Sequence, residues 1–462
     1  MVLQGESGLF ASLPDVMVPE AAGRGLPRLR MPIRNQIAMH WLTLDELLPP
    51  DHRARQVWSF VEKLDLSALY RVIKATEGRP GHPCGDPRLL MGLWLYATLE
   101  QVGSARMLER LCREHLGLRW MCGGVSVNHH TLSDFRVAHP QILEDLLTRS
   151  FAACLDAGLA TLDRVAQDGV RVRASAGAGS FRRRQRLADH LELARAELAR
   201  LRAEVHDNPA AGTRRQRAAQ ERAAREREAR VAAALQAVEA LAPHPPKRTA
   251  EALPPEDPPD PPSAAPPGGA KAKAPRASTS DVEARVMKMA DGGFRPAFNV
   301  QFATATDSQL IAAVAIGNVG SDQGQLAPMV EQLVERYGKP PRQMLVDGGF
   351  TKLADIEAVS ASGATTIYAP VIKPRDPARD PHAPRPGDTP QVVAWRGRMA
   401  TAEAKTIYKD RAATAECVNA LARNRGLQRF VVRGLAKAKA VALWFAVAHN
   451  LARAISLRPA TA

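Results

Sequence analysis

Residues 165–173 read Val-Ala-Gln-Asp-Gly-Val-Arg-Val-Arg, and this stretch decides the fold class of the chain. Its valines predict a β-strand, and Asp168 lies inside that strand. A carboxylate within a buried strand needs a partner such as a metal ion. We therefore predict that Asp168, and not the earlier Asp163, belongs to a functional site.

Two further acids have comparable settings. Asp347 ends the apolar run Met-Leu-Val and precedes Gly348 and Gly349, and Glu416 lies in a helix predicted over residues 399–425. Two carboxylates from strands and one from a helix can converge on a pair of divalent cations, which serve in-line phosphoryl transfer. Each acid also has an ordinary alternative: Asp347 can cap a turn, and Glu416 can be an exposed helix carboxylate.

Length and charge limit the possible functions. The 462 residues are enough for two or three domains, and 63 Lys plus Arg against 48 Asp plus Glu give a net charge of +15. This surplus favours a polyanionic partner. No long apolar run predicts a membrane span, and residues 1–27 lack a signal pattern. We expect a cytoplasmic, nucleoid-associated protein with no membrane partner.

The cysteines do not indicate a metal or disulfide site. There are five, with no CxxC pair among them, and an odd number in a long chain argues against a disulfide framework. The histidines near Cys112 and Cys122 do not have the spacing of a zinc finger or ribbon.

The N-terminal third is predicted to be helical. Residues 1–34 are expected to be flexible, and residues 35–160 to form an all-α domain. Short successive helices with basic positions at Arg106, Arg110 and Arg136 are similar to a helix-turn-helix DNA-binding region. A purely structural helical cap remains the alternative.

Residues 181–242 predict an antiparallel helical hairpin of coiled-coil type. The first helix carries a heptad seam, Leu187, Leu191, Ala194, Leu198, Leu201 and Val205, and the second helix begins near Thr213. Arg outnumbers Asp plus Glu by 14 to 9 over residues 182–241. The hairpin can bind DNA, dimerise, or remain solvated. A Pro-rich tether follows at residues 243–275, so the hairpin and tether are expected to interrupt a domain formed by residues 161–180 and 276–458.

The resumed domain alternates strands and helices. The predicted strands are residues 294–303, 310–316, 343–346 and 365–369, and the predicted helices are residues 323–337, 353–361, 399–425 and 435–457, with a loop from 370 to 390. This order is that of an α/β ribonuclease-H-like catalytic domain, a mixed sheet flanked by helices.

Several ordered motifs make the chain similar to a known family. They are Gln167-Asp168-Gly169 with Arg171 and Arg173, Asp281 through Lys288, Asn299-Val300-Gln301, Asn318 with Asp322 and Gln325, Val346-Asp347-Gly348-Gly349-Phe350, Tyr408 with Arg411 and Glu416, Arg423-Asn424-Arg425-Gly426-Leu427, Arg433-Gly434-Leu435 and Ala448-His449-Asn450-Leu451. Over roughly residues 35–456 the chain resembles the DDE transposases of bacterial insertion sequences.

The resemblance implies roles for individual residues. Asp168 would bridge two Mg²⁺ ions, with Mn²⁺ as a substitute, while Asp347 and Glu416 would each hold one. Tyr408, Arg411 and Glu416 resemble the family's Tyr-Arg-Glu signature, which implies that Tyr408 and Arg411 contact DNA. Four residues separate Arg411 from Glu416, one more than in the best-known version of the signature. Arg423, two helical turns after Glu416, would contact the DNA phosphate.

Other polar and aromatic residues have two interpretations each. Asp322 can cap a helix that begins at Gln323, or it can support the metal ligands. Trp395, expected in the loop between Asp347 and Glu416, can stack on a splayed base or simply pack. His449 and Asn450 are expected to satisfy hydrogen bonds in the core.

The predicted function is that of a DNA transposase that binds the terminal inverted repeats of its element. Water would cleave the DNA, and the freed 3′-hydroxyl would attack target DNA. A homodimer is expected because two ends must be joined. The alternatives are a ribonuclease-H-like nuclease without strand transfer and a non-catalytic DNA-binding protein derived from a transposase.

Overall fold

The computed structural model describes residues 41–76, 78, 84–207, 213–241, 274–374 and 378–457. The chain divides into two units, Met1–Leu47 and Leu48–Ala462. In the first unit the described residues form a short turn in which the Glu46 carboxylate accepts hydrogen bonds from Thr43. The flexible segment expected at residues 1–34 and most of the Pro-rich tether lie outside the described residues.

The N-terminal part of the second unit is helical, as predicted. Its helices are α1 (Arg53–Glu62), α2 (Ser67–Arg71), α3 (Pro87–Leu99), α4 (Ala105–Glu114), α5 (Leu116–Cys122), α6 (His129–Ala138) and α7 (Pro140–Asp156). Ser104 and Asn128 cap α4 and α6, since their side chains accept hydrogen bonds from the first turns of these helices. Helix α3 is buried on nearly every side.

Arg136 does not have the exposed position that was expected for DNA binding. Its side chain is buried, its guanidinium lies 4.5 Å from the ring centroid of Trp94, and its Nη1 donates to the carbonyl of Gly103 at 2.6 Å. A cation stacked on a tryptophan in the core holds helices together. Arg106 and Arg110, in contrast, are exposed on α4.

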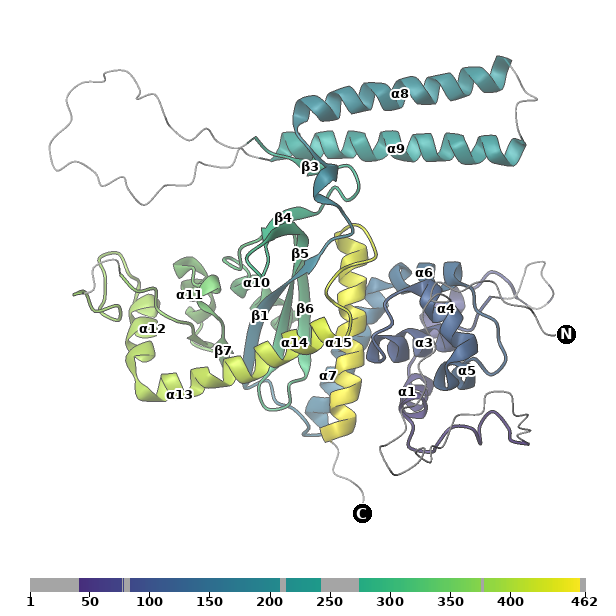
Figure 1. Cartoon of the computed structure of the whole chain (residues 1–462). Helices are drawn as coiled ribbons and strands as arrows, with labels where there is room; N and C mark the ends of the chain where they lie inside the picture. Colours follow the sequence, from purple (N-terminus) through teal and green to yellow (C-terminus); the bar gives the residue numbers. More distant parts are fainter. Residues whose placement is uncertain are drawn as a thin grey trace, which may run out of the picture. The chain divides into compact units, whose positions relative to one another are not determined.

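A mixed sheet forms the centre of the remaining chain (Figure 1). Its strands are β1 (Arg164–Arg173), β4 (Arg285–Lys288), β5 (Phe294–Ala305), β6 (Ile311–Gly317), β7 (Gln343–Leu345) and β8 (Thr366–Tyr368). Strand β1 pairs antiparallel with β5 and parallel with β7, which pairs parallel with β8. Strands β4 and β6 both pair antiparallel with β5. The short strand β4 was not predicted.

Helices flank this sheet. They are α10 (Leu326–Tyr337), α11 (Leu353–Ser360), α12 (Pro390–Ala400), α13 (Ala402–Arg411), α14 (Cys417–Asn424) and α15 (Leu435–Leu457), with a π-helix at Ala412–Glu416 between α13 and α14. Two 3₁₀ turns, Ala178–Ser180 and Gly348–Phe350, follow β1 and β7.

Helix α12 corrects one prediction. The expected loop ends in a helix that begins at Pro390, and Trp395 lies inside it, 1% exposed, with its indole donating to the carbonyl of Ala369 at 3.1 Å. Trp395 is therefore a packing residue and is not available to stack on a base. The helix was recognisable from Pro at its first position and from the buried spacing of Val392, Trp395 and Met399.

Two long helices, α8 (Arg184–Asp207) and α9 (Arg214–Ala240), pack side by side (Figure 1). Leu187 and Leu191 of α8 and Val231, Ala234 and Val238 of α9 form a small hydrophobic core of their own. Their ends are joined by the two-stranded pair β2 (Phe181–Arg182) and β3 (Ala277–Ser278). The connection between the two helices at residues 208–212 lies outside the described residues.

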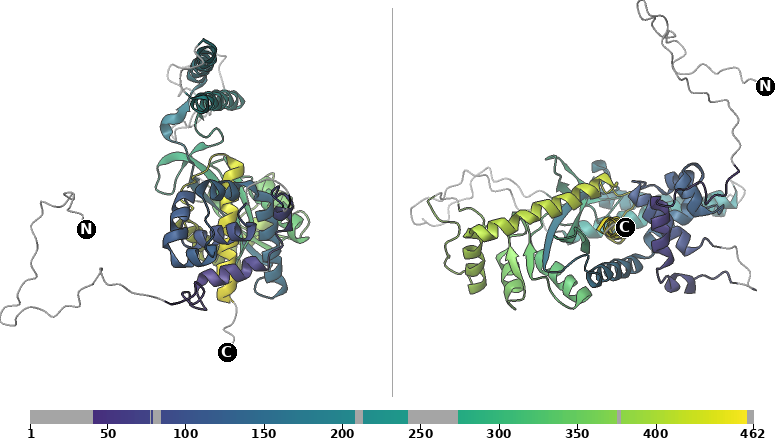
Figure 2. Two further views of the ribbon diagram at one scale, coloured as in Figure 1. Left: turned by 90° about the vertical axis from the view of Figure 1, so that its right-hand side faces the viewer. Right: turned by 90° about the horizontal axis from the view of Figure 1, so that it is seen from below.

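Helix α15 joins the helical part to the sheet (Figure 2). It packs against α7, α3 and β6, and the Trp444 indole donates to the carbonyl of Arg136 at 2.9 Å. The amide of Asn450 exchanges two hydrogen bonds with the backbone of Ile311, as its predicted core role requires. Within the described part of the chain, α15 alone has the length and hydropathy of a membrane span, and 67% of that window is buried in the protein.

Candidate active site

The three predicted acids converge on one guanidinium group. Nη2 of Arg411 lies 3.0 Å from Oδ2 of Asp168 and 3.7 Å from Oδ2 of Asp347, and Nη1 lies 3.6 Å from Oε1 of Glu416. The fold thus brings together three residues that are far apart in the sequence. They lie on β1, after β7 and at the end of the π-helix. The resemblance had assigned Arg411 to DNA; its position between the acids was not foreseen.

Asp168 is the most enclosed of the three acids. It lies in the middle of β1, and burial raises the pKa of its carboxyl to about 6, although Arg411 opposes this shift. Oδ2 of Asp168 also accepts from Nδ2 of Asn419 at 3.1 Å. We did not predict a role for Asn419. The available signal was an amide on the buried side of α14, next to Val418 and Ala422.

The π-helix accounts for the extra residue in the signature. In an α-helix, residues four apart face one another, whereas a π-helix closes its hydrogen bonds between residues five apart. Arg411 immediately precedes the π-helix and Glu416 ends it, so this five-residue step still brings their side chains within 3.6 Å. The longer spacing therefore does not separate Arg411 from Glu416.

Asp347 lies at the end of β7 and holds the turn that follows it. Its Oδ1 accepts from the backbone nitrogen of Gly349 at 2.8 Å, which is the capping role considered from the sequence. Its Oδ2 remains directed to Arg411. The same carboxylate thus serves the turn with one oxygen and the acid cluster with the other.

Asp322 lies on the opposite face of β1 from Asp168. Its carboxylate accepts from Asn299 and Gln301, each at 2.7 Å, and from Arg171 at 3.2 Å. The predicted helix cap at Asp322 was wrong, because α10 begins later, after Gln325.

Gly169 provides the space for this network. A Cβ there would lie 2.5 Å from both Oδ1 of Asp322 and Nε2 of Gln301. Asp322 therefore supports the strand that carries Asp168.

The acids have the donor chemistry that a divalent cation requires, since Mg²⁺ prefers carboxylate oxygens. Within the described residues, however, no group of three His, Cys, Asp or Glu is positioned to hold a metal ion as it stands. The guanidinium of Arg411 instead lies within 3.7 Å of a carboxylate oxygen of each of the three acids. The residues fit a cation site in type and convergence, but an arginine now provides the positive charge.

Two other predicted residues border this cluster or its helix. Burial raises the pKa of Tyr408; the positive charge of Arg411 opposes this shift, and the carboxylates of Asp347, Asp168 and Glu416 add to it. Arg423 is exposed near the end of α14.

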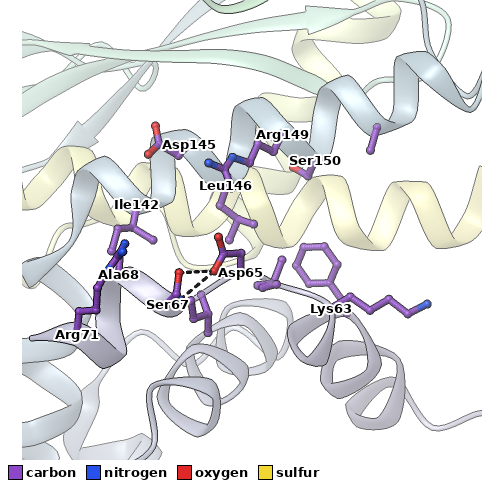
Figure 3. Close-up of a pocket in the computed structure, with 14 residues that line it drawn as sticks. Lys63, Asp65, Ser67, Ala68, Arg71, Ile142, Asp145, Leu146, Arg149 and Ser150 are labelled. Carbon is purple, nitrogen blue, oxygen red and sulfur yellow. Dashed lines mark hydrogen bonds between the residues drawn. The ribbon is translucent and has the colours of Figure 1, made fainter. Parts of the chain in front are cut away.

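A separate pocket of about 460 Å³ lies between α1, α2 and α7 (Figure 3). Its lining includes Lys63, Asp65, Arg71, Asp145 and Arg149, and the Asp65 carboxylate accepts from Ser67. None of the three acids lines it. It is not part of the acid cluster.

Two family models match the chain. A model described as Transposase domain (DUF772) matches residues 42–138, and one described as Transposase DDE domain matches residues 390–455. The second match includes Arg411 and Glu416 but neither Asp168 nor Asp347. Comparison with curated proteins and with solved structures finds no match.

The helical N-terminal part and the segment that carries Glu416 thus each match a model of a transposase domain. Together the two matches support a DDE transposase of an insertion sequence.

Proposed function

We propose that this protein is a DNA transposase that binds the terminal inverted repeats of its element and catalyses metal-dependent DNA cleavage and strand transfer. The observation that carries the proposal is the convergence of Asp168, Asp347 and Glu416 on Arg411. Carboxylates gathered in one place repel one another and cost free energy, and groups perturbed in this way cluster at functional sites.

The strand order supports a ribonuclease-H-like catalytic domain. Strands β6, β5, β1, β7 and β8 are neighbours in that order, the first three antiparallel and the last three parallel. We assign this domain to residues 161–180 and 276–458. Helices α8 and α9 are then an Arg-rich hairpin inserted at residues 181–242, between β1 and β4.

Each acid has a distinct role in the proposed chemistry. Asp168, Asp347 and Glu416 would together hold two Mg²⁺ or Mn²⁺ ions, and Asp168 is the acid closest to Arg411. When bound, the cations would supply positive charge next to the attacking and leaving oxygens of an in-line phosphoryl transfer. Asn419 orients the carboxylate of Asp168, and the Asp322 network fixes the strand beneath it.

The DNA contacts are proposed from exposed cations. Arg106 and Arg110 on α4 would bind the inverted repeats within a DNA-binding domain at residues 35–160, and Tyr408 and Arg423 would contact DNA beside the acids. The net charge of +15 favours such contacts. We also propose a homodimer, since two element ends must be joined, and a cytoplasmic location at the nucleoid.

A nicking assay on a labelled element end tests the function. We expect Mg²⁺-dependent nicking by the wild-type protein and a loss of at least about 100-fold in Asp347→Asn, because a ligand of the cations is removed. Strand transfer is scored separately with pre-cut ends, and its absence would leave a nuclease. Equal nicking by both proteins would refute the catalytic assignment.

A further inference from the structure

We propose that Arg411 serves as a stand-in cation in the DNA-free protein, and that metal ions bind only when its guanidinium leaves the three carboxylates. This inference rests on the proposed function, because it takes the acids to be the metal ligands. It goes beyond that function by making metal binding depend on the position of one side chain.

The first argument is geometric. Only the 3.0 Å contact to Asp168 is a hydrogen bond, since the distances of 3.7 Å to Asp347 and 3.6 Å to Glu416 exceed hydrogen-bonding length. Moreover, the buried Nε of Arg411 has no acceptor among the described residues. The guanidinium is held mainly by the charge of the acids and not by a set of directional bonds, so another cation can replace it.

The second argument concerns space. Mg²⁺ binds carboxylate oxygens at about 2.1 Å, and two cooperating ions lie about 4 Å apart. The carboxylates that hold such ions must therefore surround the positions of the ions, which lie in the space between the carboxylates. Arg411 now occupies the region between the three carboxylates, with its side chain only 11% exposed. Guanidinium and metal ions therefore compete for the same region.

The third argument is the alternative partner for Arg411. A guanidinium forms paired hydrogen bonds with phosphate, and a DNA backbone brought to the acids offers that group. Arg411 is the last residue of α13 and is followed by the π-helix, so its long side chain starts from an irregular point in the helix. Phosphate binding would draw Arg411 away and open the carboxylates to metal ions.

The consequence is an ordered assembly of the active site. Without DNA, the acids are neutralised in part by Arg411 and bind divalent cations weakly. With DNA, Arg411 pairs with phosphate and the acids become free. A transposase built in this way would not carry a loaded metal site before it holds its substrate.

The test measures Mn²⁺ binding to the full-length, DNA-free protein by electron paramagnetic resonance. We expect Arg411→Gln to bind Mn²⁺ roughly tenfold or more tightly than wild type, because one competing positive charge is removed from the site. Arg411→Lys, which keeps the charge on a shorter and less branched group, should lie between the two. Thermal unfolding checks that each variant is folded.

Matched controls separate the possible outcomes. Arg429→Gln removes the same charge from an exposed arginine whose backbone bridges Arg173 of β1, and it should change the Mn²⁺ affinity less than about twofold. Adding Asp347→Asn to Arg411→Gln should abolish the gain.

This inference would be overturned if wild type and both Arg411 variants bound Mn²⁺ with equal affinity while binding still required Asp347. The proposed function would remain intact. If no protein binds Mn²⁺ through Asp347, with or without an element-end oligonucleotide, the proposed function fails and the inference fails with it.

Discussion

At the scale of single residues, the ionised form of Asp168 is costly to the folded protein. Burial raises its pKa to about 6, from about 3.8 in the unfolded chain. A raised carboxyl pKa means that the folded state binds the proton more tightly than the unfolded state does. The stabilisation by the neutral acid is therefore complete below about pH 3.8 and is lost as the pH rises through 6.

This cost predicts a pH-dependent effect of Asp168→Asn. The asparagine cannot ionise, so the variant should gain free energy of unfolding relative to wild type as the pH rises. We expect a gain of roughly 1 kcal/mol between pH 5 and pH 7.5, from one pKa unit in that window. Urea unfolding of both proteins without divalent metals measures it. A difference that is constant or falls with pH would contradict the prediction.

Gly169 offers a second test at this scale. In Gly169→Ala the new methyl group would meet Asp322 and Gln301, and neither side chain can move without breaking the hydrogen bond that joins them. We expect a loss of about 1–3 kcal/mol in the free energy of unfolding. Gly348→Ala is the matched control, because Gly348 also directly follows a site acid but has open space around its Cβ position. Similar losses in both variants would refute the explanation.

The sequence allowed the three acids to be chosen because each has a distinctive local setting: Asp168 within a strand, Asp347 before two glycines, and Glu416 in a helix. It could not show that Arg411 lies between them, since that depends on how three separate elements meet. Arg136 was misplaced for a related reason. A basic residue on a short helix looks exposed until the tryptophan that covers it is located.

At the scale of elements, the π-helix at Ala412–Glu416 is the feature that sequence periodicity describes least well. The helix predicted over residues 399–425 is present from Ala402, but its register changes within the π-helix. Hydrogen bonds in a π-helix join residues five apart, whereas those in an α-helix join residues four apart. Removing one residue can therefore restore regular α-helical geometry. Both flanking faces would then keep their orientation.

This property predicts that deletion of Ala412 is tolerated. Glu416 would follow Arg411 by four positions in a continuous α-helix, still on the same face. We expect the variant to unfold cooperatively, with a free energy of unfolding within about 1 kcal/mol of wild type. Deletion of Ala420, in the regular helix α14, should instead rotate Ala422 away from the core and cost more than about 2 kcal/mol. Thermal and urea unfolding distinguish the two deletions, and equal losses would contradict the prediction.

At the scale of the whole molecule, a large core spans the N-terminal helices, one face of the sheet and α15, whereas α8 and α9 have a separate small core. Apart from β4 and α12, the order of strands and helices was predictable from periodicity. The large core that the N-terminal helices share with the sheet was not predictable, because it requires α15 to contact both α3 and β6. Alanines at Ala438, Ala442 and Ala446 permit this close approach and give no strong signal in the sequence.

The separate core of α8 and α9 predicts that they can be removed. Arg182 pairs with Ala277 in an antiparallel ladder, so Asn-Gly can replace residues 183–276 as a two-residue turn. We expect the shortened protein to keep a cooperative unfolding transition, with a free energy of unfolding within about 1 kcal/mol of wild type, since distant sites contribute independently. Circular dichroism and thermal unfolding measure this.

Ala442→Leu is the control for the same measurement, because its extra volume enters the large core and should cost about 1–3 kcal/mol while α8 and α9 remain intact. The shortened protein also shows whether the Arg-rich helices bind DNA. If they do, the dependence of DNA affinity on salt concentration must become less steep, by about one unit of slope for each lost phosphate contact. Loss of the cooperative transition in the shortened protein would mean that the helices are a required part of the fold and not an insertion.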